Sequence, residues 1–372
     1  MKKKLAILGA SEPHLPLYKK AREMGLETYC VAWSKGAFCK DYADHFCDIS
    51  ITDYKAIAEL CKSENIDGVV ANALELAVPT LAFLHENCGL NGNSIQTAIW
   101  STNKTEMRKR VSETQACPQP LYQIVGPDEV PTVDLYPVIV KPSDSSASRG
   151  ITVARRSDEL EFALNRAREY SKSKVVLIEQ LIEGTEVSVE SISYKGKHFL
   201  LTITDKETTG APYFVEIAHH QPSLLPSEIQ NRIARYNTKL LDALQINNSA
   251  SHAEFKIDEK GEVYLMEVGA RGGGGWISYK LVELSTGYDY IKGMIQVALN
   301  EFEDPVIRTG QFSGIYFLSE DTKCVKNFIL ENKDAQWMID FSIDEDKPLR
   351  KLRSSYDRTG YFIYQSNHKL KI

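Results

Sequence analysis

Residues 251–278, SHAEFKIDEKGEVYLMEVGARGGGGWIS, decide the fold of this chain more than any other stretch, because they join a strand hairpin to a run of glycines. The segments SHAEFKI and EVYLMEV are rich in aromatic and β-branched residues, which favours strands. Between them, the letters DEKG at residues 258–261 have the composition of a turn. We therefore predict an antiparallel hairpin here.

The register of this hairpin determines whether two glutamates converge. With an even number of loop residues, Ile257 faces Glu262 and Glu254 faces Leu265. Residues that are opposed or two apart share a face, so in this register one face carries His252, Glu254, Glu267, Gly269 and Arg271. Glu254 and Glu267 then lie on a diagonal, roughly 7–8 Å apart at the backbone. A loop with an odd number of residues would place them on opposite faces.

Two carboxylates on one face suit Mg²⁺, a hard cation with oxygen ligands that usually bridges protein carboxylates to substrate phosphates. The alternative is an edge hairpin whose glutamates are only solvated. The four glycines at residues 272–275 favour the metal site. A run without side chains permits close backbone approach to a ligand, or turns with positive φ.

The composition limits the classes of partner. The chain has 372 residues, enough for two or three domains, and its 25% of charged residues is ordinary for a soluble globular protein. A formal net charge of −6 gives no global attraction to nucleic acid or anionic lipid. We expect no nucleic-acid and no membrane partner, so any phosphate binding is local.

The cysteines and the N-terminus indicate a reducing compartment. Seven cysteines form an odd set without a CxxC pair, which argues against a zinc knuckle, a redox motif or a disulfide framework. The start MKKKLAILGAS has too short an apolar run for a signal peptide, and no stretch approaches the length of a membrane span. We expect reduced thiols and a cytoplasmic protein.

Strands and helices alternate in the first hundred residues. We expect strands at residues 5–8, 27–32 and 68–71, and helices at residues 15–24, 54–64 and 74–86. This alternation predicts a parallel α/β sheet with right-handed crossovers. The first strand ends in GASEPH, which lacks GxGxxG, so a dinucleotide site is poorly supported.

Beyond a proline-dotted boundary at residues 117–137, strands and helices alternate less regularly. We expect strands at residues 136–141, 151–154, 174–179, 186–194 and 198–204, and helices at residues 157–170, 226–244 and 278–301. The turn Lys195-Gly196 predicts a hairpin between the last two of these strands.

Three features upstream of the hairpin indicate phosphate binding. Lys104 follows a helix N-cap in the sequence STNK, and Lys141 ends a buried strand, VIVKP. The loop SDSSASRG has small, hydroxyl-bearing residues, so that its N–H groups and Ser145, Ser146 and Ser148 can surround phosphate oxygens. Taken singly, these are a surface lysine, a strand-end charge and a flexible connector. Together with the hairpin, they favour a nucleotide site.

This order of motifs resembles the ATP-grasp superfamily over most of the chain, and within it the L-amino acid ligases most closely. VIVKPSDSSASRGI is similar to the strand lysine and phosphate loop of that family. IEQLIEGTEVSVES is similar to its linker between two ATP-binding subdomains, and HAEFKI with MEVGAR to its paired metal carboxylates.

The resemblance implies ATP and Mg²⁺ as cofactors, with Mn²⁺ as a possible substitute, and it implies a role for each matching residue. Phosphates would be bound by Lys104, Lys141, Ser145, Ser146, Ser148, Arg149 and Gly150. Main-chain groups at Glu179, Gln180, Leu181 and Ile182 would hold adenine, and Glu186 the ribose. Glu254 and Glu267 would hold the metal. Arg271 and Lys141 are the expected catalytic residues, and Arg271 would stabilise the transferred phosphoryl group or an acyl phosphate.

One position departs from the family pattern. The family usually has ExNxR where this chain has Glu267-Val-Gly269-Ala-Arg271, so a side-chain amide ligand is missing. The number of metal ions, one or two, is therefore open. Some amine ligases of the family also carry glycine here.

The predicted fold class is α/β and α+β, in four parts. We expect an N-terminal α/β domain at residues 1–100 and a lid subdomain with the phosphate loop at residues 101–185. The subdomain with the metal and substrate site would follow at residues 186–304, and a small C-terminal α+β unit at residues 305–372.

The resemblance implies an ATP-dependent carboxylate–amine ligase that works through an acyl phosphate and releases ADP and phosphate. Its substrates would be an amino acid or another carboxylate, and an amine. Residues 202–226 resemble the wall of the amino-acid pocket, with Glu216, His219 and His220 as candidates and Lys206 nearby. Arg271, Gly272 and Gly273 suit a carboxylate-bearing substrate. A homodimer is left open.

Two other functions remain in view. The chain could be a nucleotide-binding regulatory protein that has lost turnover, as the missing asparagine suggests. The presence of both lysines, both carboxylates and Arg271 disfavours that reading. A biotin-carboxylase-like enzyme is weaker, because no biotin-carrier segment is visible in the sequence.

Overall fold

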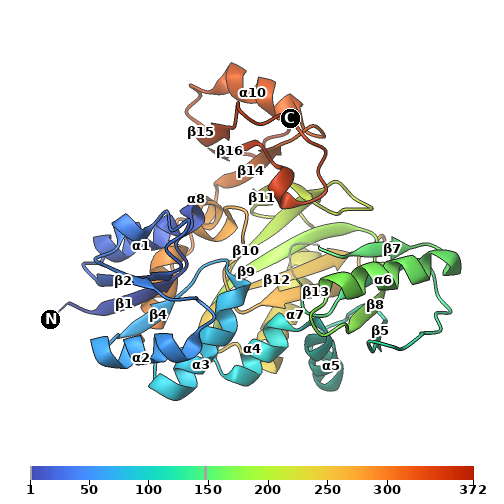
Figure 1. The fold of residues 1–372 in the computed structure, drawn as a ribbon. Coiled ribbons are helices and arrows are strands. Elements are labelled where there is room, and N and C mark those ends of the chain that lie inside the picture. The colour runs from blue at the N-terminus through green and yellow to red at the C-terminus, as the bar shows by residue number, and fades with distance from the viewer. Residues whose placement is uncertain (1, 146–148) are drawn as a thin grey trace.

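The structure is a computed structural model and describes residues 2–145 and 149–372. Its described strands form three sheets, one parallel and two antiparallel, which confirms the predicted mixed fold class. Figure 1 shows the parallel sheet at the left, a smaller antiparallel sheet at the right and the C-terminal strands at the top, around a large central sheet.

The N-terminal sheet is parallel, in the order β3-β2-β1-β4. Its strands are β1 (Lys4–Leu8), β2 (Glu27–Ala32), β3 (His45–Asp48) and β4 (Gly68–Val70), and its helices are α1 (Leu15–Glu23), α2 (Tyr54–Glu64), α3 (Val78–Cys88) and α4 (Ile95–Thr102). The short, partly exposed β3 was not predicted, because its four residues HFCD show no apolar run.

The helix predicted at residues 74–86 begins later, at Val78, after a 3₁₀ turn at Glu75–Ala77. Pro79 stands in the first turn of α3, where its missing N–H costs nothing. This turn matters for the site, because it carries Glu75 to the wall of the central cleft.

The second sheet is antiparallel, in the order β5-β8-β6-β7. Its strands are β5 (Tyr122–Val125), β6 (Val138–Pro142), β7 (Thr152–Ala154) and β8 (Val176–Gln180), and α6 (Leu160–Tyr170) packs against it. Helix α5 (Lys104–Thr114) precedes this sheet. It begins where the sequence predicts, because the side chain of Asn103 accepts hydrogen bonds from the N–H groups of Thr105 and Glu106.

The large sheet has eight antiparallel strands in the order β13-β12-β9-β10-β11-β14-β16-β15. They are β9 (Thr185–Tyr194), β10 (Lys197–Thr208), β11 (Glu216–Gln221), β12 (Ser249–Ile257), β13 (Val263–Gly269), β14 (Phe312–Leu318), β15 (Met338–Ile343) and β16 (Gly360–Ser366). The helices of this part are α7 (Ser227–Ala243), α8 (Val282–Thr286), α9 (Tyr290–Ala298) and α10 (Cys324–Asn332).

The C-terminal strands continue the large sheet, because β14 pairs with β11 through Ala218 and Tyr316. The N-terminal sheet is also joined to it by packing. One buried cluster contains Ile7 of β1, Ile192 of β9 and Met294 of α9. The apolar faces of both sheets therefore share a core, which fixes the N-terminal sheet against the large sheet.

The β12–β13 hairpin forms, but the predicted register is wrong. Ile257 pairs with Val263 and not with Glu262, so the loop at residues 258–262 has an odd number of residues. A β-bulge then inserts Met266, and beyond it Glu254 pairs directly with Glu267. The bulge cancels the effect of the odd loop. The two glutamates share a face as expected, although they are opposed and not diagonal.

Among residues 2–145 and 149–372, no helix combines the length and the apolar character that crossing a membrane requires.

Candidate functional site

A cleft of about 630 Å³ lies between the second sheet and the large sheet, and the turn that precedes α3 also contributes to its wall. This volume is in the range of small-molecule sites. The predicted site residues that line it are Lys104, Lys141, Ser145, Arg149, Glu179, Gln180, Leu181, Ile182, Glu186, Glu216, His219, Glu254, Glu267 and Arg271. The fold thus brings together residues that are far apart in the sequence.

Each glutamate of the opposed pair is held by a cation. Lys104 Nζ lies 2.7 Å from Glu267 Oε1, and Lys206 Nζ lies 2.6 Å from Glu254 Oε1. His252 also contacts Glu254 Oε1, at 3.2 Å. Burial opposes ionisation of Glu254, but Lys206 and His252 hold its pKa well below the ordinary range. Glu254 is therefore charged, and both side chains are fixed in position by their cations.

Lys206 is the centre of a buried charge cluster. Besides Glu254, its Nζ lies 3.3 Å from Glu186 Oε1 and 3.3 Å from Glu216 Oε1. Although burial alone would lower its pKa, these carboxylates raise the pKa of Lys206 well above the ordinary value. Burial likewise opposes the charge of His252, but Glu190, whose Oε1 lies 2.7 Å from its Nδ1, raises the pKa of His252 to about 9.

The second predicted lysine is fixed by the second sheet. Lys141 Nζ lies 2.7 Å from Glu179 Oε2, while the other oxygen of Glu179 accepts from Arg108 Nε at 2.6 Å. Burial raises the pKa of the Glu179 carboxyl, but Arg108 and Lys141 outweigh it and lower the pKa to about 2. The side chain of Glu179 is therefore occupied by two cations, so only its main chain is left for a nucleotide.

The loop between β6 and β7 is described only in part. Ser145 and Arg149 line the cleft, and the Ser145 carbonyl accepts from Lys104 Nζ at 3.1 Å. Ser146 and Ser148 lie outside the described residues. Gly150 lies behind the cleft wall, where its φ of +73° and the 2.7 Å that would separate a Cβ from Tyr170 require glycine. Its local role is packing.

The predicted adenine and ribose residues lie on the cleft wall. The N–H of Gln180 donates to Leu121 O at 2.8 Å, and that of Leu181 donates to Pro137 O at 3.2 Å. Any main-chain donor to a base therefore has to come from elsewhere, and Ile182 is the next residue in line. Glu186 faces Lys206 and, at 3.8 Å, Lys256.

Of the two neighbouring histidines, only His219 lines the cleft. Because side chains alternate along a strand, His220 points to the opposite side of β11, where Nδ1 bonds Tyr364 and Nε2 contacts Glu207. The prediction of His220 as a substrate residue is wrong for this reason. Burial lowers the pKa of His219 to about 3, so its ring is neutral.

The first two glycines of the run, Gly272 and Gly273, are packed so closely that neither position has room for a side chain. A Cβ on Gly272 would lie 2.5 Å from Asn72 Oδ1, and one on Gly273 would lie 2.7 Å from His252 Nδ1. These two glycines lie behind the cleft wall, whereas Gly274 and Gly275 line it. The tight packing of Gly273 seats the run directly on His252, beside the carboxylate pair.

Gly269, the departure from the expected pattern, lies opposite His252 in the hairpin. A Cβ here would lie 3.2 Å from Arg271 Cγ, so the side chain of Arg271 covers this position. Arg271 donates to the Gly272 carbonyl at 3.0 Å and lies 3.6 Å from Glu75 Oε2.

Three further residues of the site were not predicted. Arg108 lies one helical turn after Lys104 in α5, a spacing that places both on one helix face and could have indicated it. Glu75 follows β4, at an edge of a parallel sheet where ligands commonly bind. Arg358 reaches the cleft from the C-terminal part, and no local pattern marks it.

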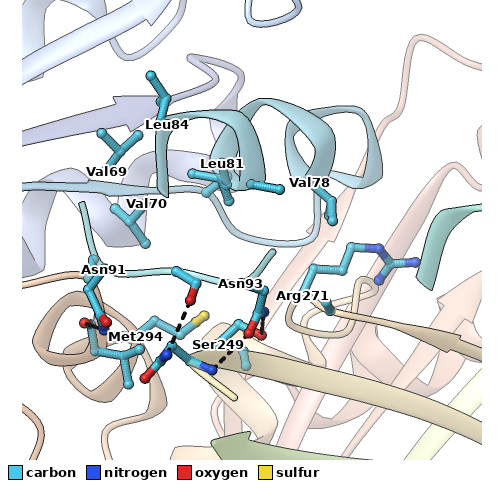
Figure 2. A pocket seen from close by; sticks show the side chains of 18 of the residues that line it. Val69, Val70, Val78, Leu81, Leu84, Asn91, Asn93, Ser249, Arg271 and Met294 are labelled. Carbon is cyan, nitrogen blue, oxygen red and sulfur yellow. Dashed lines mark hydrogen bonds between the residues drawn. The ribbon is translucent and has the colours of Figure 1, made fainter. Parts of the chain in front are cut away.

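A second, smaller cavity of about 60 Å³ lies between α3 and the start of β12. Figure 2 shows its apolar side chains, including Val70, Leu81 and Met294, with Arg271 at one end and its guanidinium directed away from them. Arg271 and Leu74 line both this cavity and the cleft. Arg271 therefore lies between the N-terminal domain and the carboxylate pair.

The carboxylate pair fits a hard divalent cation. Glu254 and Glu267 are opposed in the hairpin, and each forms an ion pair, with Lys206 and Lys104 respectively. In the part of the chain that the structure describes, no group of three or more His, Cys, Asp or Glu side chains is placed to hold a metal by itself. The pair would share an ion with oxygens of a ligand, which is the usual mode for Mg²⁺ beside phosphates.

Comparison with known proteins matches part of the chain to one domain family. Residues 135–280 match the model of the ATP-grasp domain. The chain is 26% identical over 272 residues to an alanine–anticapsin ligase of Bacillus subtilis (strain 168), covering 65% of this chain and 56% of that protein. It is 29% identical over 231 residues to a D-alanine–D-alanine ligase B of Chromobacterium violaceum, covering 59% of this chain and 70% of that one.

Among solved structures, an L-amino acid ligase from Bacillus licheniformis superposes with a TM-score of 0.82. That likeness covers 99% of this chain and 94% of the other at 23% sequence identity, and so shows the fold. The alignments with the alanine–anticapsin ligases span just over half the length of those proteins.

Proposed function

We propose that this chain, which carries an ATP-grasp domain at residues 135–280, is an ATP-dependent carboxylate–amine ligase. In the proposed reaction a carboxylate accepts the terminal phosphoryl group of ATP to form an acyl phosphate. The amine of a second substrate then displaces phosphate and forms an amide or peptide bond. The observation that carries this proposal is the opposition of Glu254 and Glu267, beside Lys104, in one cleft.

Glu254 and Glu267 would hold Mg²⁺, which supplies neutralising charge between the nucleotide phosphates when it is bound. Mn²⁺ accepts the same carboxylate oxygens and is the proposed substitute. Gly269 offers no side-chain ligand, so a second ion would depend on water or substrate oxygens. Lys206 and His252 keep Glu254 ionised and oriented toward the ion.

Phosphoryl transfer demands positioned cations more than covalent chemistry from the protein. Lys104 and Lys141 are proposed to neutralise the phosphates, because each ammonium group lies in the cleft and is held by one glutamate. Arg271 is proposed to stabilise the transferred phosphoryl group. The phosphate loop, with Ser145 and Arg149 on the cleft wall, would cover the phosphates.

The base and sugar of the nucleotide are assigned to the linker between the sheets. Carbonyls of residues 179–182, with the N–H of Ile182, would hold adenine, and Glu186 would accept from the ribose hydroxyls. Both assignments rest on the position of these residues on the cleft wall, next to Lys141.

The proposed substrates are an amino acid or another carboxylate, and an amine. The amino-acid ligases among the relatives support this class. Neutral His219 has Nδ1 near the Gly275 carbonyl, and its Nε2 has no partner within the described residues, so Nε2 is proposed to accept a hydrogen bond from the attacking amine. We further propose small-molecule partners only, a cytoplasmic location, and the four-part division at residues 100, 185 and 304. A homodimer is compatible with this proposal.

Product analysis tests the mechanism. The protein is incubated with ATP, Mg²⁺ and pairs of amino acids, and the nucleotides are separated by chromatography while phosphate is assayed. We expect ADP, phosphate and amide bond in equal amounts. AMP and pyrophosphate as the main products would overturn the acyl-phosphate mechanism and the roles of Glu254, Glu267 and Arg271. Nucleotide binding without turnover for any pair would favour a regulatory protein instead.

A further inference from the structure

Arg358 is a buried arginine that the C-terminal part of the chain supplies to the cleft. It follows a short turn at Ser355–Asp357 and precedes β16. Its side chain is 13% exposed, and it lines the cleft together with Ser355 and Tyr356. No residue proposed above for the nucleotide or the metal comes from this part of the sequence, so Arg358 calls for a separate explanation.

The backbone on both sides of Arg358 is anchored. The Asp357 carboxylate accepts from the N–H of Ser354 at 2.9 Å, which closes a capping box on the preceding turn. On the other side, the N–H of Thr359 donates to the Leu318 carbonyl at 2.9 Å. The guanidinium is therefore positioned by the fold before any ligand arrives, which lowers the entropic cost of binding.

The surroundings leave part of the guanidinium unused. Its carbon lies 3.7 Å over the ring centroid of Phe317, and Nη2 donates to the main-chain oxygen and to Oε2 of Glu216 at 2.7 and 2.9 Å. Nε is buried and has no hydrogen-bond partner within the described residues. Buried N–H groups are nearly always paired, so an acceptor is expected to reach this edge.

Arg358 shares its carboxylate partner with Lys206. Glu216, its carboxylate partner, also lies 3.3 Å from the Lys206 ammonium through Oε1. One carboxylate therefore faces two buried cations. Burial lowers the pKa of Arg358, and Glu216 offsets this only in part. Lys206 is also paired with Glu186 and Glu254, so the feature that marks Arg358 for a ligand is its unpartnered Nε and not an excess of positive charge.

His219 provides a second recognition group beside Arg358. Its ring packs edge-on against the same Phe317, with centroids 5.5 Å apart, and its buried Nε2 also has no partner within the described residues. A neutral imidazole nitrogen accepts a hydrogen bond, whereas a guanidinium only donates. An α-amino acid, with a carboxylate next to an amine, matches this donor and acceptor in one molecule.

We propose that Arg358 is the residue that selects the amine-donating substrate by binding its α-carboxylate. This inference rests on the proposed ligase function and deepens it, because it names the amine as that of an amino acid. The carboxylate would accept from the guanidinium N–H groups that Glu216 does not use, with Nε among them, while Nη2 remains with Glu216. A planar fork is suited to two oxygens in a way that an ammonium group is not.

The test compares acids with their carboxamides. Steady-state kinetics are measured for wild type and Arg358→Lys with ATP, Mg²⁺, one fixed amino acid as the carboxylate substrate, and the twenty L-amino acids or their carboxamides as amine donors. In the variant we expect KM for the acid to rise roughly 10- to 100-fold, the scale of a charge-assisted hydrogen bond. KM for the carboxamide and for ATP should change by less than about twofold, since neither uses the fork. Arg358→Lys keeps the positive charge next to Glu216 and so protects the fold.

Arg353→Ala is the matched control, because Arg353 is an exposed arginine of the same segment. It should leave both KM values unchanged. An equal loss for acid and carboxamide in Arg358→Lys would show that Arg358 only positions Glu216. Equal KM values of the wild type for amino acids and their carboxamides would also overturn the proposal.

A wild type that joins no pair would refute the ligase function, and calorimetry then decides the present proposal separately. The same acids and carboxamides are titrated into the protein with Mg²⁺ and ADP. Binding of an acid that its carboxamide does not reproduce, lost in Arg358→Lys, would support the carboxylate site. No difference between acids and carboxamides would refute it.

Discussion

Met266 is the residue on which the geometry of the carboxylate pair depends. If the pairing continued from Leu265 without the bulge, Glu254 would oppose Met266. Glu267 would then oppose Ala253, on the other face of the hairpin. Arg108 supports the bulge, since its guanidinium donates to the carbonyls of Leu265 and Met266 at 2.9 Å each. A side chain of α5 thus helps to hold the main chain that aims Glu267.

Glu267→Gln tests the role of the pair at the residue scale. The substitution keeps the size of the side chain but removes the charge that faces Lys104 and the proposed ion. We expect turnover to fall by roughly 10²-fold or more, the scale of losing one key electrostatic contact, with an unchanged fold. Steady-state assays at saturating ATP and Mg²⁺ measure this. Glu259→Gln, at an exposed position of the same hairpin, is the control, and near-normal turnover in Glu267→Gln would exclude the hairpin as metal site.

Glu179 links pH to stability. Its pKa is lowered to about 2 in the folded protein, against 4.5 as the ordinary value. Because the folded value is the lower one, the stabilisation is complete above pH 4.5 and is lost as pH falls toward 2. Glu179→Gln should cost roughly 3 kcal/mol at pH 7, the scale of breaking a buried ion pair, and progressively less in acid.

Urea unfolding of both proteins between pH 3 and pH 7 measures this difference. Glu129→Gln, whose carboxylate accepts from the main chain of Gly126 at the surface, is the comparison. A constant difference between wild type and Glu179→Gln over the whole range would contradict the assignment of the low pKa to this ion pair.

At the scale of elements, the second sheet has its own hydrophobic core, with Val140, Ala163 and Ile178. It contacts the large sheet and α5 partly through charged side chains. Lys104, from α5, connects it to the hairpin through the Ser145 carbonyl and Glu267. An element with its own core and polar contacts across a cleft can respond to a ligand as one body.

Nucleotide should therefore slow amide exchange in this sheet. We expect peptides that cover β6 and β7 to exchange more slowly with ATP and Mg²⁺, because phosphates bound between Lys141 and Lys104 would join the two sides of the cleft. Hydrogen–deuterium exchange followed by mass spectrometry measures it. Peptides from α10, which lies apart from the cleft, serve as the internal control. Unchanged exchange in β6 and β7 would mean that nucleotide binds elsewhere.

For the whole molecule, the C-terminal residues belong to the central sheet. Strand β14 pairs with β11, and its Ile315 is buried in the cluster that also holds residues of β1 and α9. Arg358 carries the same segment to the cleft. The part of the chain that follows residue 304 is thus a structural and a chemical partner of the site.

Truncation after residue 304 should consequently destabilise the whole protein. It removes β14, β15 and β16, uncovers the edge of β11 and removes the apolar side chains, including Tyr316 and Phe362, that form a buried cluster with Ala218. We expect an insoluble product or a loss of cooperative unfolding, because exposed strand edges and apolar surface promote aggregation. A soluble fragment that melts like the full chain in circular dichroism would show an independent C-terminal unit.

Local patterns in the sequence predict the α/β start, the hairpin, and two glutamates, two lysines and an arginine in a recognisable order. These features follow from local patterns: apolar periodicity, turn residues and the N-cap Asn103 are read within a few residues. The same local rules missed the bulge at Met266, because it is stabilised by contacts from outside the hairpin, here those of Arg108.

Which side chains meet in the cleft depends on the three-dimensional fold. His219 and His220 are equivalent in the sequence, and strand alternation together with Tyr364 separates them. Glu75, Lys206 and Arg358 reach the cleft from three distant parts of the chain. Their charges act over a few ångströms in a buried setting, so their effects depend on spatial neighbours that no sequence spacing specifies.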